Sequence, residues 1–497
     1  MIVDTLRKKI VPMGEWAPDL ALLGSTGGAV AQNVIPWTQG YKSFRSLVVR
    51  SSALTARFQG GTFGRDTGAN VYNYAGDATK LYQQGPGSVN YTDSSRLVGG
   101  AYGTVTEDWW EYVQWGQTVI ATNYTDVPQV ITLAGANFAA LGGTPPRARH
   151  VGIVRDFVVF GNVNYGAGPT PNRLYWSAIN NSADYTIAAA TQCDIQDLQG
   201  DGGAIQKVIG GEYGLIFQER AIWRMTYVGS PVVFQFDLVE RNRGAFAPQS
   251  VIGWGNVVFF LASDGFYAYL GGLTVPIGAG KVDTTFLSDL QTSFAYRVNA
   301  AIDPLNKLVM WAYPGAGSTN GTCNRIMIYN WAVKRWSRIE GLSLDALVRF
   351  AATGYSLEGL DAISGSIDAL SPSLDSPAWA GGVQLMAAFD SSHKLNTISG
   401  SAMTAMVDTG ETQLSPGMRS SVLYSRPLVD GTAASVTLGS RNRIADTITY
   451  GAAVSQDATG SCAHRSNARY HTARTVTASD FNFIQGVELT YTQDGER

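Results

Sequence analysis

The stretch VVFFLASDGFYAYLGG, residues 257–272, predicts two strands joined by a tight turn. An apolar run reaches Asp264-Gly265, and a run of aromatic residues, 266–269, returns from it. Asp-Gly is a dipeptide that type I′ hairpin turns favour, because both central residues of such a turn need a positive φ. The stretch is therefore interpreted as a β-hairpin that turns at Asp264-Gly265.

The same strand–turn–strand pattern returns along the chain at a regular spacing. Successive patterns lie 39 to 57 residues apart, and four-stranded propeller blades repeat every ~40 to 50 residues. Residues 251–256 and 298–304 fit inner strands that precede two of the hairpins. One apolar residue marks each pattern: Val71, Val119, Val158, Leu215, Val258, Val309 and Leu360.

A ring of such units explains why the hairpins repeat. One small twisted sheet cannot bury both of its faces, whereas each sheet in a ring packs against its neighbours. The sequence therefore predicts an all-β fold with a β-propeller of six to eight blades. The alternative interpretation is an irregular β protein of several sheets without a ring.

The pattern changes toward the C-terminus. A Ser/Pro/Gly-rich segment, residues 371–382, precedes one more strand, and longer strands then follow at closer spacing. Such strands are typical of a small antiparallel β-sandwich. We therefore divide the chain into an N-terminal extension (1–47), a propeller (48–395) and a C-terminal sandwich-like domain (396–497).

The composition fits a packed β protein. Of the 497 residues, 45% are hydrophobic and only 15% are charged, against about 25% charged in ordinary globular domains. The net charge of −3 provides no basic field for tight nucleic-acid binding. No stretch approaches the ~18 apolar residues of a membrane-spanning helix, so we expect no membrane span.

Cysteine usage indicates a reducing compartment. The three cysteines, Cys193, Cys323 and Cys462, are odd in number, lie far apart and form no Cys-x-x-Cys pair. This pattern predicts free thiols, in contrast to the disulfide framework of a small secreted domain. We therefore expect the chain to be made in the cytoplasm.

Motifs for nucleotide binding or nucleophilic catalysis are missing from the sequence. Residues 276–282, PIGAGKV, lack the first Gly and the Ser or Thr of a phosphate loop, since Val275 and Val282 stand there. Residues 390–393, DSSH, hold the residue types of a catalytic triad, but a triad is assembled in space from separate segments. We predict no catalytic residue, no cofactor and no enzyme activity.

Two further sets of residues have the types needed to bind a metal or to cleave a glycoside. Cys462 and His464 share a face of a predicted strand and His471 follows, but no fourth ligand is evident, so we predict no metal site. Paired carboxylates cleave glycosides in some propellers. The candidates for such a role are Asp264, Asp283 and Asp303.

Several arginines accompany the strands of the predicted sandwich. They are spread over several strands and form no basic run, which favours solvated or ion-paired charge over a nucleic-acid or partner-binding patch. These residues are Arg419, Arg426, Arg441, Arg443, Arg465, Arg469 and Arg474.

Three phrases, taken in order, carry a family resemblance. GEWAPDL (14–20) followed by AQNVIPWTQGYKSFRSL (31–47) resembles the opening of the tail hub, or nozzle, proteins of short-tailed bacteriophages. These proteins are also called packaged-DNA stabilisation proteins or tail tubular protein B. Residues 387–414 and 468–489 resemble late segments of the same proteins. The resemblance therefore spans nearly the whole chain.

The resemblance implies a structural virion protein. It implies a ring of six copies below the portal and adaptor that retains packaged DNA and conducts it during ejection. The implied partners are further copies of the chain, the portal–adaptor proteins, tail fibre, spike or needle proteins, and passing duplex DNA without sequence specificity. The implied location is the virion tail, after assembly in the host cytoplasm.

Two other kinds of function remain open from the sequence. The many aromatic residues also fit a carbohydrate-binding or carbohydrate-active propeller, although the repeated sialidase boxes are missing. A cellular interaction propeller of the WD-repeat kind is disfavoured, because the paired Gly-His and Trp-Asp marks are missing as well.

The resemblance also suggests a role for the N-terminal segment. In a ring of blades this segment commonly supplies a strand that completes the last blade. The alternation of Tyr41, Phe44 and Leu47 after Gly40 fits such a strand, and Pro36 is expected to end the pairing before it. The alternative is an ordinary first strand of the first blade.

Overall fold

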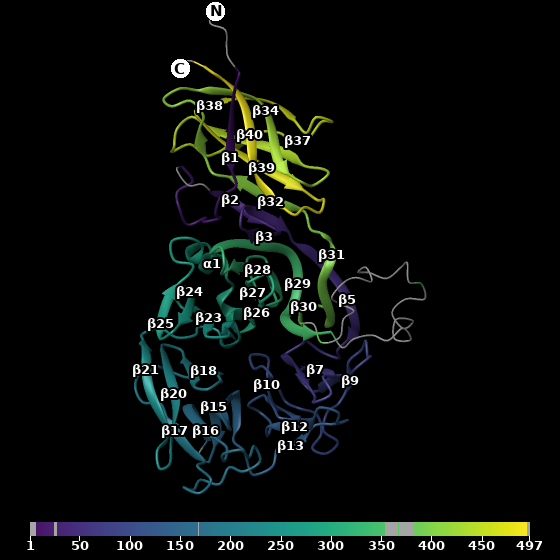
Figure 1. Cartoon of the computed structure of the whole chain (residues 1–497), viewed down its shortest axis with the longest axis vertical. Coiled ribbons are helices and arrows are strands. Elements are labelled where there is room, and N and C mark those ends of the chain that lie inside the picture. Colours follow the sequence, from purple (N-terminus) through teal and green to yellow (C-terminus); the bar gives the residue numbers. More distant parts are fainter. Residues whose placement is uncertain are drawn as a thin grey trace, which may run out of the picture.

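The computed structural model describes residues 6–23, 27–166, 168–352, 366, 382 and 384–494. Two bodies make up this part of the chain, a propeller and a β-sandwich, with the sandwich at one end (Figure 1). No helix of the described residues is long and apolar enough to cross a membrane. The marker Leu360 and nearly all of the predicted join at 371–382 lie outside the described residues.

Five four-stranded antiparallel sheets follow one another along the chain, each with its strands in chain order. The first two are β6 Gly61–Arg65, β7 Val71–Gly76, β8 Leu81–Gln84 and β9 Thr92–Asp93; then β10 Glu111–Trp115, β11 Thr118–Thr122, β12 Gln129–Thr132 and β13 Ala139–Ala140. The third is β14 Arg147–Val154, β15 Phe157–Tyr165, β16 Gly168–Trp176 and β17 Asp194–Asp197. The fourth and fifth are β18 Ile205–Ile209, β19 Gly214–Gln218, β20 Ala221–Gly229 and β21 Val233–Arg241; then β22 Ile252–Trp254, β23 Val257–Ala262, β24 Gly265–Leu270 and β25 Leu273–Pro276.

Two further blades share one long strand. The sixth blade runs β26 Asn299–Asp303, β27 Leu308–Tyr313, β28 Cys323–Asn330 and β29 Arg335–Ala351. The first half of β29 pairs with β28, and its second half, from Leu344, pairs with β30. The seventh blade is therefore the second half of β29, β30 Gln384–Asp390, β31 Lys394–Ala402 and β5 Arg45–Ala53.

The ring closes on a strand from the other end of the chain. β5 pairs with β31 in the register Leu47↔Ile398 and Val48↔Thr397, and Figure 1 shows it beside β31. In the described part of the chain, seven inner strands (β6, β10, β14, β18, β22, β26 and β29) therefore surround the axis. The predicted all-β propeller is confirmed, and the six described marker residues all lie on the second strands of their blades.

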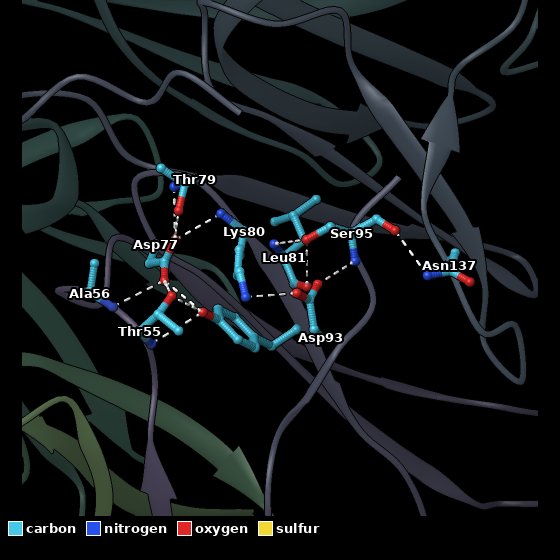
Figure 2. Close-up of polar contacts among 10 residues, drawn as sticks. Thr55, Ala56, Asp77, Thr79, Lys80, Leu81, Asp93, Ser95 and Asn137 are labelled. Carbon is cyan, nitrogen blue, oxygen red and sulfur yellow. Dashed lines mark hydrogen bonds and ion pairs between the residues drawn. The ribbon is translucent and has the colours of Figure 1, made fainter. Parts of the chain in front are cut away.

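A buried carboxylate fastens this closure (Figure 2). Asp77, in the turn between β7 and β8, accepts hydrogen bonds from the Thr55 hydroxyl at 2.9 Å and the Ala56 N–H at 3.2 Å. It also accepts hydrogen bonds from the Tyr82 hydroxyl at 2.7 Å and the Lys80 N–H at 2.7 Å. A buried carboxylate requires hydrogen-bond donors, and Asp77 takes them both from the segment that follows β5 and from the first blade. These hydrogen bonds therefore connect that segment to the first blade.

The sandwich combines both ends of the chain. One sheet holds β1 Arg7–Pro12, β3 Val34–Trp37, β4 Gly40–Ser43, β34 Ser420–Val429, β38 Cys462–Ala468 and β40 Ile484–Gln493. The other layer holds β2 Gly27–Gln32, β32 Ala405–Thr409, β33 Thr412–Gln413, β35 Ser435–Arg441, β36 Thr449–Tyr450, β37 Val454–Ser455 and β39 Tyr470–Thr477. It is continuous with the sixth blade, because Gln32 of β2 pairs with Arg338 of β29. Their inner faces share one apolar core, which includes Val422, Val436, Ala473 and Leu489.

The structure moves both predicted domain boundaries. The boundary at 47/48 cuts through β5 and the boundary at 395/396 cuts through β31, and both of these strands belong to the seventh blade. The first 43 residues supply β1 to β4 to the sandwich instead of forming a separate extension. The sequence pattern marks a strand but not its partner, and here the partners lie hundreds of residues away.

The predicted blade-closing strand is displaced by a few residues. Gly40 and Tyr41 lie in β4, which pairs with β3 and touches β40 in the sandwich. Pro36 pairs with Tyr41 inside the β3–β4 hairpin, so it does not end the pairing. Phe44 links the two bodies, and the closing strand begins at Arg45.

The predicted turn at Asp264-Gly265 is also wrong by one residue. Ala262 pairs with Gly265, so the central residues are Ser263 and Asp264, and neither has a positive φ. The turn is therefore not type I′. Gly265 itself has a φ of 142°, and a Cβ there would lie 2.2 Å from the carboxyl carbon of Asp283. The glycine is required by this close approach.

Three short helices complete the described chain. They are η1 Pro248–Ser250, α1 Asp283–Asp289 and η2 Thr292–Arg297, which lie before β22 and between β25 and β26. The three cysteines are buried free thiols.

Candidate functional site

A cavity of about 600 Å³ lies on the axis of the propeller. The inner strands of all seven blades contribute to its wall. Several glycines belong to this wall, and a Cβ at Gly60 or Gly210 would clash with the backbone of the neighbouring blade. The lining glycines are Gly60, Gly61, Gly152, Gly210, Gly253 and Gly255. This cavity is the candidate site.

A polar network contributes to one part of the cavity wall, through Glu111, Lys207 and Gln249. Glu111 Oε1 accepts hydrogen bonds from Lys207 Nζ at 2.7 Å and from Gln249 Nε2 at 2.9 Å. The same oxygen lies 3.0 Å from His150 Nδ1, and Lys207 also donates to Gln249 Oε1 at 3.1 Å. We call these four residues the axial network. Because they come from the second to the fifth blades, the network links four neighbouring blades.

The charges of the axial network are paired and buried. Glu111 is only 5% exposed. Burial opposes its ionisation, but the charges and hydrogen bonds of Lys207 and His150 outweigh burial and lower the pKa of Glu111 to about 2. Glu111 therefore stays ionised at neutral pH and is a poor general base. The network acts as a brace between blades.

One end of the cavity opens to solvent. Gly255, which follows the inner strand β22, lines the cavity and is itself exposed. The apolar wall towards this end includes Phe63, Val113, Ile153 and Ile209. A small molecule can therefore enter the cavity beside Gly255.

The three carboxylates considered for sugar cleavage lie apart from the cavity and have separate roles. Asp264 pairs with Arg243 at 3.0 Å. Asp283 begins α1 and accepts the Phe266 N–H at 3.1 Å, and burial raises the pKa of Asp283 to about 6. Asp303 accepts the Leu305 N–H at 3.0 Å in the turn after β26. None of the three lines the axial cavity.

The DSSH segment has a structural role. The Asp390 carboxylate accepts N–H groups within its own turn, including that of Ser392 at 2.8 Å. His393 Nδ1 lies 2.5 Å from Oδ2 of Asp345, a residue of β29. Burial raises the pKa of Asp345 against the opposing effect of His393. The pair holds the β30–β31 turn against β29, and no serine of this segment meets His393.

The Cys/His set of the sandwich does not form a metal centre. His464 Nε2 lies 2.8 Å from the Ser425 hydroxyl, while His471 Nε2 faces the Ser420 and Ala468 carbonyls at 3.2 Å. Within the described residues, no group of three or more His, Cys, Asp or Glu side chains could hold a metal ion.

Two of the sandwich arginines form buried ion pairs. Arg441 pairs with Glu411, and Arg474 Nε pairs with Asp408 Oδ1 at 2.8 Å. Arg426, Arg443 and Arg465 are exposed. Arg419 is half-buried and donates to the Asn467 carbonyl at 3.3 Å.

The axial network was missed from the sequence because its members are far apart. Glu111 and Gln249 are separated by 138 positions, and no motif contains both. A usable signal was present: Glu111, His150 and Lys207 each interrupt the apolar pattern of a strand that begins a blade. Polar residues at equivalent positions of successive repeats meet on the axis of a ring.

Comparison with known proteins finds structural similarity but no sequence relative. No protein-family profile matches the chain, and no curated protein matches its sequence. Among solved structures, the Neurospora crassa Pan2 WD40 domain is 6% identical, with a TM-score of 0.37 over 71% of this chain and 94% of that one. YCF48 bound to D1 peptide is 10% identical, with a TM-score of 0.36 over 75% and 99% of the two chains. The extracellular domain of the B. thetaiotaomicron two-component system BT4673 is 10% identical, with a TM-score of 0.42 over 85% of this chain and 48% of that one.

Proposed function

We propose that the chain is a structural virion protein of a short-tailed bacteriophage. It forms a ring below the portal and adaptor, retains the packaged DNA and conducts it during ejection. The observation that supports this most is the meeting of the three tail-hub-like stretches, 31–47, 387–414 and 468–489, at the junction between propeller and sandwich.

Specific contacts connect these stretches at the junction. Asn33 Nδ2 donates to the Thr404 carbonyl at 3.0 Å, and the Met403 N–H donates to the Phe44 carbonyl at 2.9 Å. The Ser43 hydroxyl donates to Asp480 Oδ1 at 2.5 Å. These contacts hold the resembling stretches to one another. The contacts between the two bodies also use propeller residues outside those stretches, since the Ser337 hydroxyl donates to the Val34 carbonyl at 2.6 Å.

The junction is crossed by two adjacent segments of the chain. The chain leaves the sandwich after β4 and returns to it after β31, and β5 and β31 are paired where they enter the propeller. A two-segment crossing resists bending better than a single linker does. Such a subunit suits a ring that withstands the pressure of packaged DNA.

The path of DNA in this proposal lies between subunits. The axial cavity has a volume of about 600 Å³ and is lined in part by the axial network, whereas the major groove of duplex DNA alone is about 12 Å wide. Duplex DNA therefore cannot pass through the blades. Six copies carry a net charge of −18 (6 × −3), which favours release over adhesion.

Reconstitution with the portal–adaptor complex tests this proposal. Negative-stain imaging is expected to show a collar of six copies on the adaptor face, and the portal without its adaptor serves as the control. A monodisperse monomer that never joins the complex would contradict the proposal.

A further inference from the structure

Three charged side chains line the axial cavity: Glu111, Lys207 and Arg349. Glu111 and Lys207 belong to the axial network, where each is satisfied by the other and by Gln249. Arg349 lies in the second half of β29, on the seventh blade. The lining therefore carries one negative and two positive charges, a net charge of +1.

Arg349 has no counter-ion within the described part of the chain. Its guanidinium forms no ion pair and no hydrogen bond with any described residue, and the side chain is half-buried. Burial alone lowers the pKa of Arg349, with no contribution from a neighbouring charge. Taking a cation partly out of water without a partner is costly, so the fold keeps an uncompensated positive charge beside an open cavity.

We propose that the axial cavity binds a small oxyanion, a phosphate or carboxylate group, on Arg349. The guanidinium presents parallel N–H donors that match two oxygens of such a group. The anion enters from the end marked by Gly255 and meets Arg349 without displacing the axial network. This site is independent of the proposed assembly role.

Other features of the lining agree with a small ligand. Asn299 donates a hydrogen bond to the Leu347 carbonyl at 2.8 Å, and its uncharged amide is no counter-ion for Arg349. Trp109, Trp110 and Phe63 give the remaining wall an aromatic character. The cavity volume excludes duplex DNA but accommodates an organic anion of modest size.

Calorimetric titration of the full chain tests the site. Inorganic phosphate and acetate, each added in a low-chloride buffer, distinguish the two oxyanion sources. We expect one of them to bind with 1:1 stoichiometry, and Arg349→Met to weaken that binding about tenfold or more, because a charge-assisted contact is lost. Arg220→Met is the matched control, since Arg220 is exposed and far from the cavity lining.

Thermal melts provide a second readout. The anion that binds is expected to raise the melting temperature of the wild type. Arg349→Met is expected to melt higher than the wild type in anion-free buffer and to gain nothing from the anion. If Arg349→Met does not fold, Arg349→Lys keeps the charge without the paired donors and is expected to bind more weakly. Absence of binding by both anions, or unchanged binding in the Arg349 variants, would overturn the proposal.

Discussion

At the scale of single residues, Glu111 determines how the axial network is held. Glu111→Gln removes the charge that Lys207 and His150 share, and leaves the Lys207 ammonium buried without a counter-ion. We expect a loss of about 3 to 5 kcal/mol in the free energy of unfolding, measured by urea denaturation. The double variant Glu111→Gln/Lys207→Met is expected to recover part of the loss; additive losses would show that the two groups are not coupled.

The stabilisation by Glu111 has a defined pH dependence. Its pKa is lowered on folding from 4.5 to about 2, so the folded state holds its proton less readily than the unfolded state. The stabilisation is therefore complete above pH 4.5 and is lost as the pH falls toward 2. The gap in unfolding free energy between the wild type and Glu111→Gln is expected to shrink in that window. A gap independent of pH would refute this assignment.

Single residues also show which local features could be predicted from the sequence and which could not. The hairpin around Asp264 could be predicted, because apolar alternation and turn residues are local signals. The requirement for Gly265 could not be predicted, because Asp283 fills the space beside it from another element. The position of Arg349 beside a cavity could not be predicted either, because a single arginine in an apolar strand gives no information about the space around it.

At the scale of elements, β24 provides a test of this close approach. Gly265→Ala places a Cβ 2.2 Å from the Asp283 carboxyl group, in addition to the strain of a φ of 142°. Gly271→Ala, at a φ of 59° with nothing within 4 Å, is the matched control. We expect the control to lose about 1 to 2 kcal/mol of stability and Gly265→Ala to lose clearly more, as measured by thermal melts. Equal losses of stability in the two variants would mean that the Asp283 side chain moves away from the new Cβ without a measurable cost.

The strand β5 shows why element partners could not be predicted. The sequence indicated a closing strand near its true position, but β5 pairs with β31, hundreds of residues away. Nothing in the alternation of a strand identifies its neighbour, so the sequence alone predicts an extension where the structure has N-terminal strands of the sandwich. Six of the blades could be predicted because each is built from one continuous segment.

A disulfide across this closure tests the pairing of β5 with β31. Ala53 and Lys394 are directly paired, so Ala53→Cys/Lys394→Cys is expected to form a disulfide on mild oxidation. Closing so long a loop typically adds about 2 to 4 kcal/mol, seen as a higher melting temperature that returns to normal under reductant. Each single variant is the control. Failure to cross-link, as judged by mass spectrometry, would contradict the closure.

At the scale of the whole molecule, the chain is a seven-blade propeller joined to a sandwich by two adjacent segments. The propeller class could be predicted from the period of the hairpins. The shape of the junction could not be predicted from the sequence. It depends on contacts such as those of Asn33 and Ser43 with residues from the other end of the chain.

The proposed role also predicts weak binding to DNA. With a net charge of −3 and two of its sandwich arginines in internal pairs, the isolated chain has few free cations for phosphates. We expect filter binding to duplex DNA no tighter than the nonspecific range of about 10⁻⁴ to 10⁻⁶ M at physiological salt. Nanomolar affinity with a steep salt dependence would favour a DNA-binding protein over a conduit.

The most direct test of the proposed role is DNA retention in virions that lack this protein. Particles assembled without it are expected to fill with DNA and then lose it, so that added nuclease degrades the genome. Particles complemented with the wild-type chain are expected to protect it. Particles that lack the protein, keep their DNA under nuclease and remain infectious would contradict the account.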